Sequence, residues 1–389
     1  MRTKATLLSA AAVVLALFAF GQAQEPEPTS RRPQHILTGW NQFYRGEMTR
    51  YNPYEKFLTV NNVRKLRLKW KTIIGDNQSS SPAVFDGVVY FGSVDDTNVY
   101  AVDAHTGLVK WTFTTGGLVF SSPAAANGVV YIGSSNGTLY ALNAKDGSPL
   151  WTYSNNGYVE SSPAVQDGVV YFGAGNGNVY ALDARTGRSL WKFKTNDGGF
   201  SASSPSVANG MVYVGADGEA TVYGLNAKTG ERVWSYAPFS PVLGTPVVNG
   251  VVYVSTRGGA IYALDAFTGT ELWIYPTAGQ VESSPAVAFG TVYVGTVYPD
   301  ETLYALDAKT GVKLWNYKPG GPIFTSPALA NGIVFAGSDA GRFYALDAST
   351  GAKLWSYNIG GPMGPSPAVV NGVLYGGYGG VYAFGLKHH

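Results

Sequence analysis

Two short segments of this sequence place a glutamate directly before a Ser-Ser-Pro triplet, and these glutamates are the side chains best suited to bind something. The segments are "GYVESSP", which contains Glu160, and "GQVESSP", which contains Glu282. Phe120 in "LVFSSP" and Phe324 in "PIFTSP" stand at the equivalent position. Carboxylates accept hydrogen bonds, and aromatic rings offer apolar contact area. If the fold brings these side chains to one mouth, they could grip a ligand or a partner chain.

Three further residues join this group of candidates. Phe200 lies in "GGFSASSP", and Arg257 lies in "STRGGA" between two predicted strands. Asn176 lies in "GAGNGN", and "GSSNGT" at residues 133–138 has the same form. Because Asn-Gly is the preferred tip of a type I′ hairpin, we interpret Asn176 first as a turn residue.

Other arrangements that perform catalysis are missing from the sequence. There is no cysteine, which excludes disulfides, thiolate nucleophiles and thiolate metal sites. The four histidines, at 35, 105, 388 and 389, are not placed for a catalytic triad or a metal cluster. The acidic segments "SVDDT" and "YPDET" lack the alternating ligand spacing of a calcium loop. We therefore predict no catalytic residue and no metal site.

The strands that position these candidates belong to units of an internal sequence repeat. Tryptophans recur at spacings of 39 to 43 residues, and Ser or Thr before Pro recurs at the same period. Each unit contains four short strand patterns separated by hairpin turns, as in "SPAV", "GVVYFG", "NVYALDA" and a strand ending around Trp. This pattern predicts an all-β fold, an eight-bladed β-propeller. The recurring tryptophans are Trp70, Trp111, Trp151, Trp191, Trp234, Trp273, Trp315 and Trp355.

The two ends of the repeat predict how the ring closes. "LRLKW", which ends at Trp70, has the pattern of a fourth strand but precedes any first strand, and the last unit stops after its third strand. We therefore expect residues 66–71 to pair with residues 380–386 and complete the last blade. The propeller then comprises residues 66–389, and the lead-in segment, residues 40–65, precedes it.

The N-terminal residues predict export. Arg2 and Lys4 precede an apolar run at residues 7–20, and small residues at Gly21 and Ala23 follow. This is typical of a secretory signal peptide, residues 1–23, with residues 24–39 as a flexible linker. We expect a soluble periplasmic or extracellular protein without a membrane span, although a retained anchor is the alternative. The formal net charge of +2 does not indicate a nucleic-acid partner. We expect a monomer that binds a protein or a small molecule at one propeller face.

The segment that joins the third and fourth strands carries a motif that resembles one of a known family. AxDxxTGxxxW, as at Ala181, Asp183, Thr186, Gly187 and Trp191, resembles the tryptophan-docking motif of PQQ-type propellers. These are the quinoprotein alcohol dehydrogenases and propellers of BamB-like architecture. The resemblance implies a structural role for the eight repeated tryptophans, which lie between blades. Trp40 lies outside the repeat, and we expect it to contribute less to stability than Trp191.

The resemblance also implies what a cofactor site would need. In the family's dehydrogenases the quinone lies between a tryptophan and a disulfide, and Ca²⁺ is held by Glu, Asn and Asp. Here there is no cysteine, and eight of the nine tryptophans belong to the repeat. We predict no cofactor and a non-catalytic binding or assembly scaffold in the cell envelope. The alternative is a minimal PQQ- and Ca²⁺-dependent quinoprotein dehydrogenase, with Asn176 as a metal ligand.

The export prediction can be tested by N-terminal sequencing of the protein recovered from its native host. We expect Gln24 as the first residue, because small side chains at positions 21 and 23 suit signal peptidase. A chain that begins at Met1 in a membrane fraction would contradict this expectation.

Overall fold

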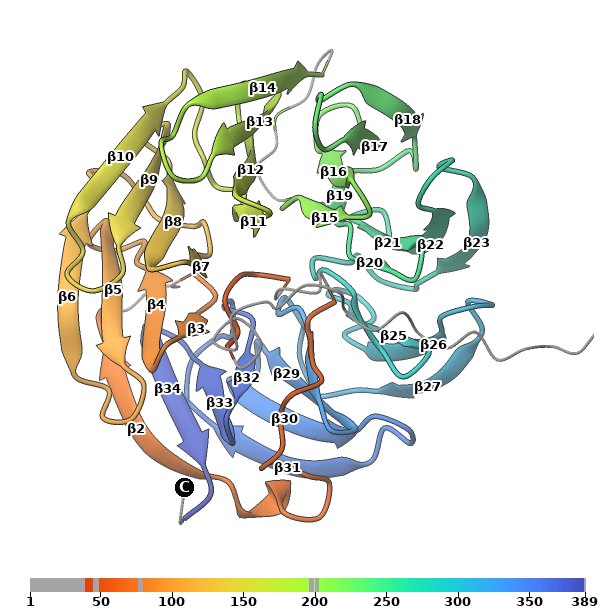
Figure 1. The fold of residues 1–389 in the computed structure, drawn as a ribbon. Helices are drawn as coiled ribbons and strands as arrows, with labels where there is room; N and C mark the ends of the chain where they lie inside the picture. Colours follow the sequence, from red (N-terminus) through yellow and green to blue (C-terminus); the bar gives the residue numbers. More distant parts are fainter. Residues whose placement is uncertain (1–38, 45–48, 76–79, 196–198, 200–202, 388–389) are drawn as a thin grey trace, which may run out of the picture. The chain divides into compact units, whose positions relative to one another are not determined.

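The repeat folds into eight sheets arranged around one axis, which confirms the predicted eight-bladed propeller (Figure 1). The computed structural model describes residues 39–44, 49–75, 80–195, 199 and 203–387. The expected signal peptide and residues 24–38 of the expected linker lie outside the described residues. Within the described part of the chain, no helix is long and apolar enough to cross a membrane.

Each blade has four main antiparallel strands, from the channel outward. The innermost strands of blades 1 to 8 are β3 (Ala83–Phe85), β7 (Ala124–Ala126), β11 (Ala164–Gln166), β15 (Ser206–Ala208), β19 (Val242–Gly244) with β20 (Val247–Val248), β24 (Ala286–Ala288), β28 (Ala328–Ala330) and β32 (Ala368–Val370). The second strands are β4 (Val88–Gly92), β8 (Val129–Ser134), β12 (Val169–Ala174), β16 (Met211–Ala216), β21 (Val251–Thr256), β25 (Thr291–Gly295), β29 (Ile333–Ser338) and β33 (Val373–Gly376). The third strands are β5 (Asn98–Asp103), β9 (Thr138–Asn143), β13 (Asn178–Asp183), β17 (Thr221–Asn226), β22 (Ala260–Asp265), β26 (Leu303–Asp307), β30 (Arg342–Asp347) and β34 (Gly380–Gly385). The outer strands are β6 (Val109–Thr114), β10 (Pro149–Ser154), β14 (Ser189–Lys194), β18 (Arg232–Tyr236), β23 (Glu271–Pro276), β27 (Lys313–Tyr317), β31 (Lys353–Asn358) and, in blade 8, β2 (Arg67–Ile73).

The turns between first and second strands follow from their sequence. Most are Asn-Gly or Asp-Gly, and both residues adopt positive φ, as at Asp167 (50°) and Gly168 (79°). This is the type I′ geometry that matches the twist of a hairpin. Blade 6 is different, because Phe289 adopts a φ of 56° in the place of Asn or Asp. Its ring packs edge-on against Tyr51 of the lead-in segment, with centroids 4.9 Å apart, which explains the exception.

Neighbouring blades are joined by a contact that repeats around the ring. Trp151 of blade 2 donates its indole N–H to the carbonyl of Ala184 in blade 3, at 3.1 Å. Its ring lies over Gly187, where a Cβ atom would come within 2.7 Å of the indole. Tyr131 of blade 2 donates to the same carbonyl at 2.9 Å. The turn itself is held by Asp183, whose Oδ1 accepts from the backbone N–H of Thr186 at 2.8 Å. Each residue type of the motif therefore has a local or inter-blade contact.

The last blade is completed by the N-terminal strand. β2 pairs antiparallel with β34, with Trp70 opposite Ala383 and Lys71 opposite Tyr382. Trp355 of blade 7 donates to the carbonyl of Leu66, directly after the 3₁₀ helix η1 (Val63–Lys65). Leu66 therefore replaces the turn alanine that blade 8 lacks, and the predicted closure is observed.

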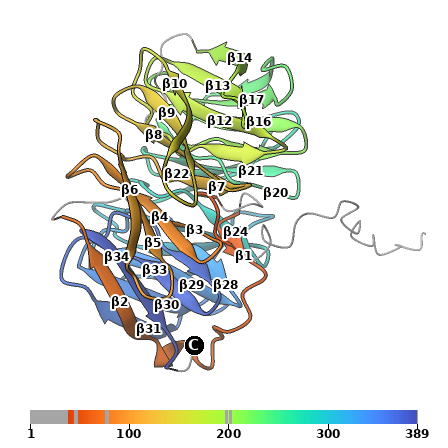
Figure 2. The same ribbon diagram turned by 60° about the vertical axis from the view of Figure 1, so that its left-hand side comes forward.

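The lead-in segment lines the channel and contacts the free edges of the innermost strands. Trp40 exchanges two backbone hydrogen bonds with Val84 of β3, at 2.8 and 2.7 Å. The strand β1 (Tyr51–Asn52) pairs in parallel with β28, beside β24 (Figure 2). Further backbone N–H groups, one from each of several innermost strands, donate to this segment: Ala125 to the Asn41 carbonyl, Val165 to Gln42 Oε1, Val287 to the Thr49 carbonyl and Leu329 to the Arg50 carbonyl. The lead-in segment thus forms hydrogen bonds with the innermost strands of several blades around the channel.

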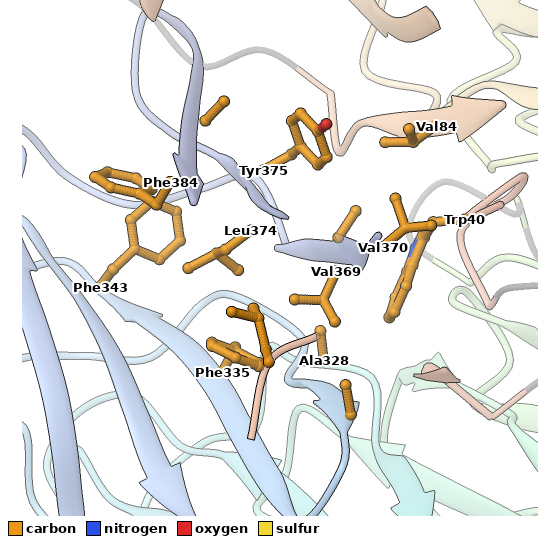
Figure 3. Close-up of a cluster of buried hydrophobic side chains, with 14 of the residues drawn as sticks. Trp40, Val84, Ala328, Phe335, Phe343, Val369, Val370, Leu374, Tyr375 and Phe384 are labelled. Carbon is orange, nitrogen blue, oxygen red and sulfur yellow. The ribbon is translucent and has the colours of Figure 1, made fainter. Parts of the chain in front are cut away.

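The structure corrects the expected ranking of Trp40 and Trp191. Trp40 is only 1% exposed and packs with Val84, Val369 and Val370 in a hydrophobic cluster of the ring (Figure 3). Trp191 is only partly buried, at the edge of its cluster. The sequence pattern identifies Trp191 through its repeat, but it contains no such signal for a tryptophan that fills the channel.

We now expect Trp40→Ala to be the more destabilising of the two substitutions. Loss of a fully buried indole costs about 3 to 5 kcal/mol, and Trp191→Ala should cost less because part of its ring is already exposed to solvent. Urea unfolding of both variants measures the difference. An equal or larger loss at Trp191 would contradict the role assigned to the lead-in segment.

Candidate functional site

A cavity of about 380 Å³ lies at one end of the channel. Its walls come from the loops that enter the innermost strands, and Phe43 of the lead-in segment lies on the channel side. The remaining lining residues are Ser80, Ser81, Phe120, Ser122, Glu160, Ser162, Ser204, Leu243, Glu282, Ser284, Phe324, Ser326, Gly364, Pro365 and Ser366. The cavity therefore presents hydroxyl, phenyl and carboxylate groups.

Phe43 is held in place by a buried arginine. The Arg50 guanidinium lies 4.7 Å from the Phe43 ring centroid and 5.4 Å from that of Trp40. Its three nitrogens donate to the backbone carbonyls of Pro327, Phe43 and Pro367 at 2.9, 2.6 and 2.8 Å. Burial lowers the pKa of the Arg50 guanidinium to about 9, so the group is still protonated at neutral pH. Arg50 therefore ties the lead-in segment to blades 7 and 8 beneath the cavity.

In six of the eight blades, two hydroxyl residues precede the proline, and their hydrogen bonds shape the walls of the cavity. The first serine bonds within its own blade, as Ser161 Oγ accepts from the Gly173 N–H at 3.0 Å. The second bonds to the preceding blade, as Ser162 Oγ accepts from the Ser122 N–H at 3.0 Å. The same inter-blade bond joins Ser81 to Ser122, Ser162 to Ser204, Ser284 to Ser326, Ser326 to Ser366 and Ser366 to Ser81. These bonds form a belt around most of the channel.

Tyr44 completes this belt where the repeat departs from its pattern. Blade 5 has Gly244 and Thr245 in place of the two serines, and a Cβ atom at Gly244 would come within 2.6 Å of Ser284. The Tyr44 hydroxyl accepts from the Thr245 N–H at 3.1 Å and donates to Ser284 Oγ at 3.4 Å. Burial raises the pKa of Tyr44, so its hydroxyl stays protonated and can donate. The lead-in segment thus supplies the missing link between blades 5 and 6.

The structure brings four of the predicted site residues to this cavity. Phe120, Glu160, Glu282 and Phe324 all line it, and both phenyl rings are substantially exposed. Arg257 is not part of the lining, but its Nε lies 2.9 Å from Glu282 Oε1 in an ion pair. Phe200 lies outside the described residues.

Asn176 does not line the cavity and instead bonds within its own turn and to the loop that enters its blade. Its side-chain oxygen accepts from the Asn178 N–H at 3.1 Å. Its Nδ2 donates to Asn155 Oδ1 at 3.1 Å and to the Tyr180 hydroxyl at 2.9 Å. These contacts occupy the amide on both sides and support the turn interpretation.

The two carboxylates of the cavity have different surroundings. Glu282 forms an ion pair with Arg257, whereas Glu160 accepts from the Ser135 hydroxyl, at 3.1 Å. Burial raises the pKa of the Glu160 carboxyl, the Ser135 hydrogen bond opposes this rise, and the charge of Asp217 adds to it. Glu160 is therefore a partly desolvated carboxylate with no basic partner recorded beside it among the described residues.

The residues of this cavity do not match a quinone site. Pyrroloquinoline quinone is a planar tricarboxylate, so it needs cationic groups around it and flat surfaces on both sides. The lining supplies the carboxylates Glu160 and Glu282, and Arg257 is already paired. Within the described ranges, no three His, Cys, Asp or Glu side chains gather closely enough to hold a metal ion.

Three important residues of this site, Phe43, Tyr44 and Arg50, are not among the site residues predicted from sequence. All three lie in the lead-in segment, which has no internal copy for comparison. The Ser or Thr before Pro marks each unit in the sequence, and the structure adds its role as an inter-blade acceptor. The signal for this role is a hydroxyl residue at the same position in every unit. It stands directly before a proline, which has no backbone N–H of its own.

Removal of the Tyr44 hydroxyl tests the bridge between blades 5 and 6. In Tyr44→Phe the buried N–H of Thr245 loses its acceptor, which should reduce the free energy of unfolding by about 1 to 3 kcal/mol. Tyr317→Phe is the matched control, because no hydrogen bond is recorded for its hydroxyl among the described residues. Equal thermal stability of the two variants would argue against the bridge.

The fold is shared with solved structures of different kinds. A europium-containing methanol dehydrogenase is 19% identical, with a TM-score of 0.76 over 88% of this chain and 90% of that one. BamB from Moraxella catarrhalis is 20% identical, with a TM-score of 0.68 over 83% of this chain and 98% of that one. The computationally designed Ika8 protein is 19% identical, with a TM-score of 0.72 over 82% and 100%. At these identities the likeness concerns the fold alone.

The sequence itself was compared with curated proteins and with family models. No curated protein matches. The family model described as outer membrane protein assembly factor BamB matches residues 61–163, 156–243, 238–367 and 318–384. Because these matches span nearly the whole ring, the chain belongs to this family of PQQ-like β-propellers.

Proposed function

We propose that this protein is an exported, non-catalytic propeller that binds a partner chain at the cavity on its axis. The observation that carries this proposal is the cavity itself, which is lined by loop residues at one end of a rigid ring. A repeated frame holds these loops in fixed positions, so that their individual side chains can select a partner. The family described by BamB is consistent with an assembly role.

The polar groups of the cavity favour binding over chemistry. Glu282 is engaged by Arg257, and the serine hydroxyls accept backbone N–H groups of the adjoining blades. None of the described lining residues is a histidine that could act as a base toward these hydroxyls. The lining can form hydrogen bonds and apolar contacts, which are what a partner segment requires.

A minimal PQQ- and Ca²⁺-dependent dehydrogenase is the second candidate. The fold it shares with methanol dehydrogenase is the observation in its favour. Against it stand the carboxylates of the lining and the amide of Asn176, which is engaged by Asn178 and Asn155. A quinone carries the redox step, and the protein must hold it and place a base. We assign neither task to a residue of this chain.

Photo-cross-linking in the native host tests the proposed function. A photoreactive amino acid in place of Phe324, at the cavity, should give one discrete cross-linked product. The same amino acid in place of Leu108, which is 70% exposed on a turn at the opposite end of the blade, should give none. Equal products at both positions, or none at either, would refute a partner at the cavity.

The enzymatic alternative is decided in the same set of experiments. Protein incubated with PQQ and Ca²⁺ should not oxidise a panel of alcohols and sugars in a dye-linked assay. Turnover that disappears in Glu160→Gln or Glu282→Gln would make the protein a dehydrogenase and overturn the binding proposal.

A further inference from the structure

The two glutamates of the cavity occupy the same position in two different repeats. Glu160 precedes the innermost strand of blade 3, and Glu282 precedes that of blade 6. Each faces the residue that follows the second strand of the preceding blade, Ser135 in one case and Arg257 in the other. The backbone of these two residues is held alike, because Ser135 donates its N–H to Leu118 and Arg257 donates to Pro241, both at 2.9 Å. The side chains are therefore directly comparable.

The two glutamates differ in the charge of the described residue that each one contacts. Arg257 donates Nε and a terminal nitrogen to the two oxygens of Glu282, at 2.9 and 3.4 Å. Ser135 offers Glu160 a single neutral hydroxyl at 3.1 Å. Among the described residues, the repeat thus places a guanidinium beside Glu282 and only a neutral hydroxyl at the equivalent place beside Glu160. A partly buried carboxylate without a counter-charge gains most from a cation that arrives from outside.

The surrounding charges act in the same direction. Arg257 and Lys318 are the basic residues of the described loops at this end of the blades, and both are paired, with Glu282 and with Asp300. The carboxylates of these loops are Asp95, Asp96, Glu160, Asp217, Glu219, Glu282, Asp300, Glu301 and Asp339. Such an excess of negative charge attracts a positive group to the mouth.

The aromatic residues of the lining provide a second kind of contact for a cation. Phe120 lines the cavity from the loop before blade 2, next to the loop of Glu160, and is 46% exposed. A ring face in this position can accept a cation–π contact. The protein already contains one such pair, because the Arg50 guanidinium lies over the ring of Phe43. Phenyl groups beside a carboxylate suit a guanidinium better than a neutral ligand.

We propose that Glu160 and Phe120 bind an arginine or lysine side chain of the partner chain, in the place that Arg257 occupies beside Glu282. This inference rests on the proposed function and specifies the chemistry of the partner. The shared chemistry is a guanidinium or ammonium group, which could also come from a free amine. We commit to the partner chain, because the cavity of about 380 Å³ is open to loops on which a longer segment could lie.

Calorimetric titration with short capped peptides tests this proposal. Capped Gly-Arg-Gly should bind with one site per chain, and capped Gly-Gln-Gly should not bind. Glu160→Gln should weaken binding of the arginine peptide at least tenfold. Ser135→Arg should also abolish it, because the new guanidinium fills the site as Arg257 does beside Glu282. Arg257→Ser should raise the stoichiometry to two sites, since it uncovers Glu282.

The matched control is Glu301→Gln, which removes the same charge from the same end of the blades but does not line the cavity. We expect this control to bind the peptide within twofold of the parent. Binding that falls equally in Glu301→Gln and Glu160→Gln would reduce the effect to general charge and overturn the proposal. Unchanged binding in Ser135→Arg would overturn it as well. If Ser135→Arg does not fold, the nearly isosteric Glu160→Gln decides the question alone.

Two further outcomes separate this inference from the proposed function. If the arginine peptide does not bind but cross-linking at Phe324 still yields one product, the cationic specificity is wrong and the binding role stands. If agmatine, a free guanidinium amine, binds more than tenfold tighter than the peptide, the occupant is a free amine and the proposal for a partner chain is overturned.

Discussion

The structure depends on how the backbone N–H groups on the channel-facing edge of each innermost strand find hydrogen-bond acceptors. Each of these strands pairs with the second strand of its blade on one side only, and a buried backbone N–H without an acceptor is costly. The lead-in segment accepts from Val84, Ala125, Val165, Val287 and Leu329 in turn. One chain segment therefore satisfies several blades, fills the channel with Trp40 and places Phe43 against the cavity.

This arrangement links the stability of the ring to the shape of the site. Arg50 joins the lead-in segment to blades 7 and 8, and Tyr44 joins blade 5 to blade 6. The serine belt continues the connection through most of the remaining blades. Because these groups are buried and mutually bonded, the loops of the cavity rest on a stiff base. Their differences from blade to blade, such as Ser135 against Arg257, then become differences in what each part of the mouth can bind.

The charge distribution explains how such a site can coexist with an almost neutral chain. The formal net charge is +2, yet the described loops at the cavity end are rich in carboxylates. Antiparallel strands separate the two ends of every blade, so acidic and basic residues can gather at different ends without changing the overall balance. The net charge of the chain therefore does not indicate which ligands it binds. The local excess of carboxylates at the cavity end favours a cationic group.

The sequence by itself determined the all-β class, the eight units, the hairpin turns and the closing strand, because these features follow from short-range patterns that the chain repeats. It also identified Phe120, Glu160, Glu282 and Phe324, because they occupy a position that varies between repeat units that are otherwise similar. Tertiary structure alone decided the burial of Trp40, the bridge from Tyr44 to Ser284 across 240 residues, and the pairing of Arg257 with Glu282. These contacts join a unique segment to a ring, or one unit to the next, and no local pattern encodes them. They form only when the blades close around the axis and bring distant residues within hydrogen-bonding distance.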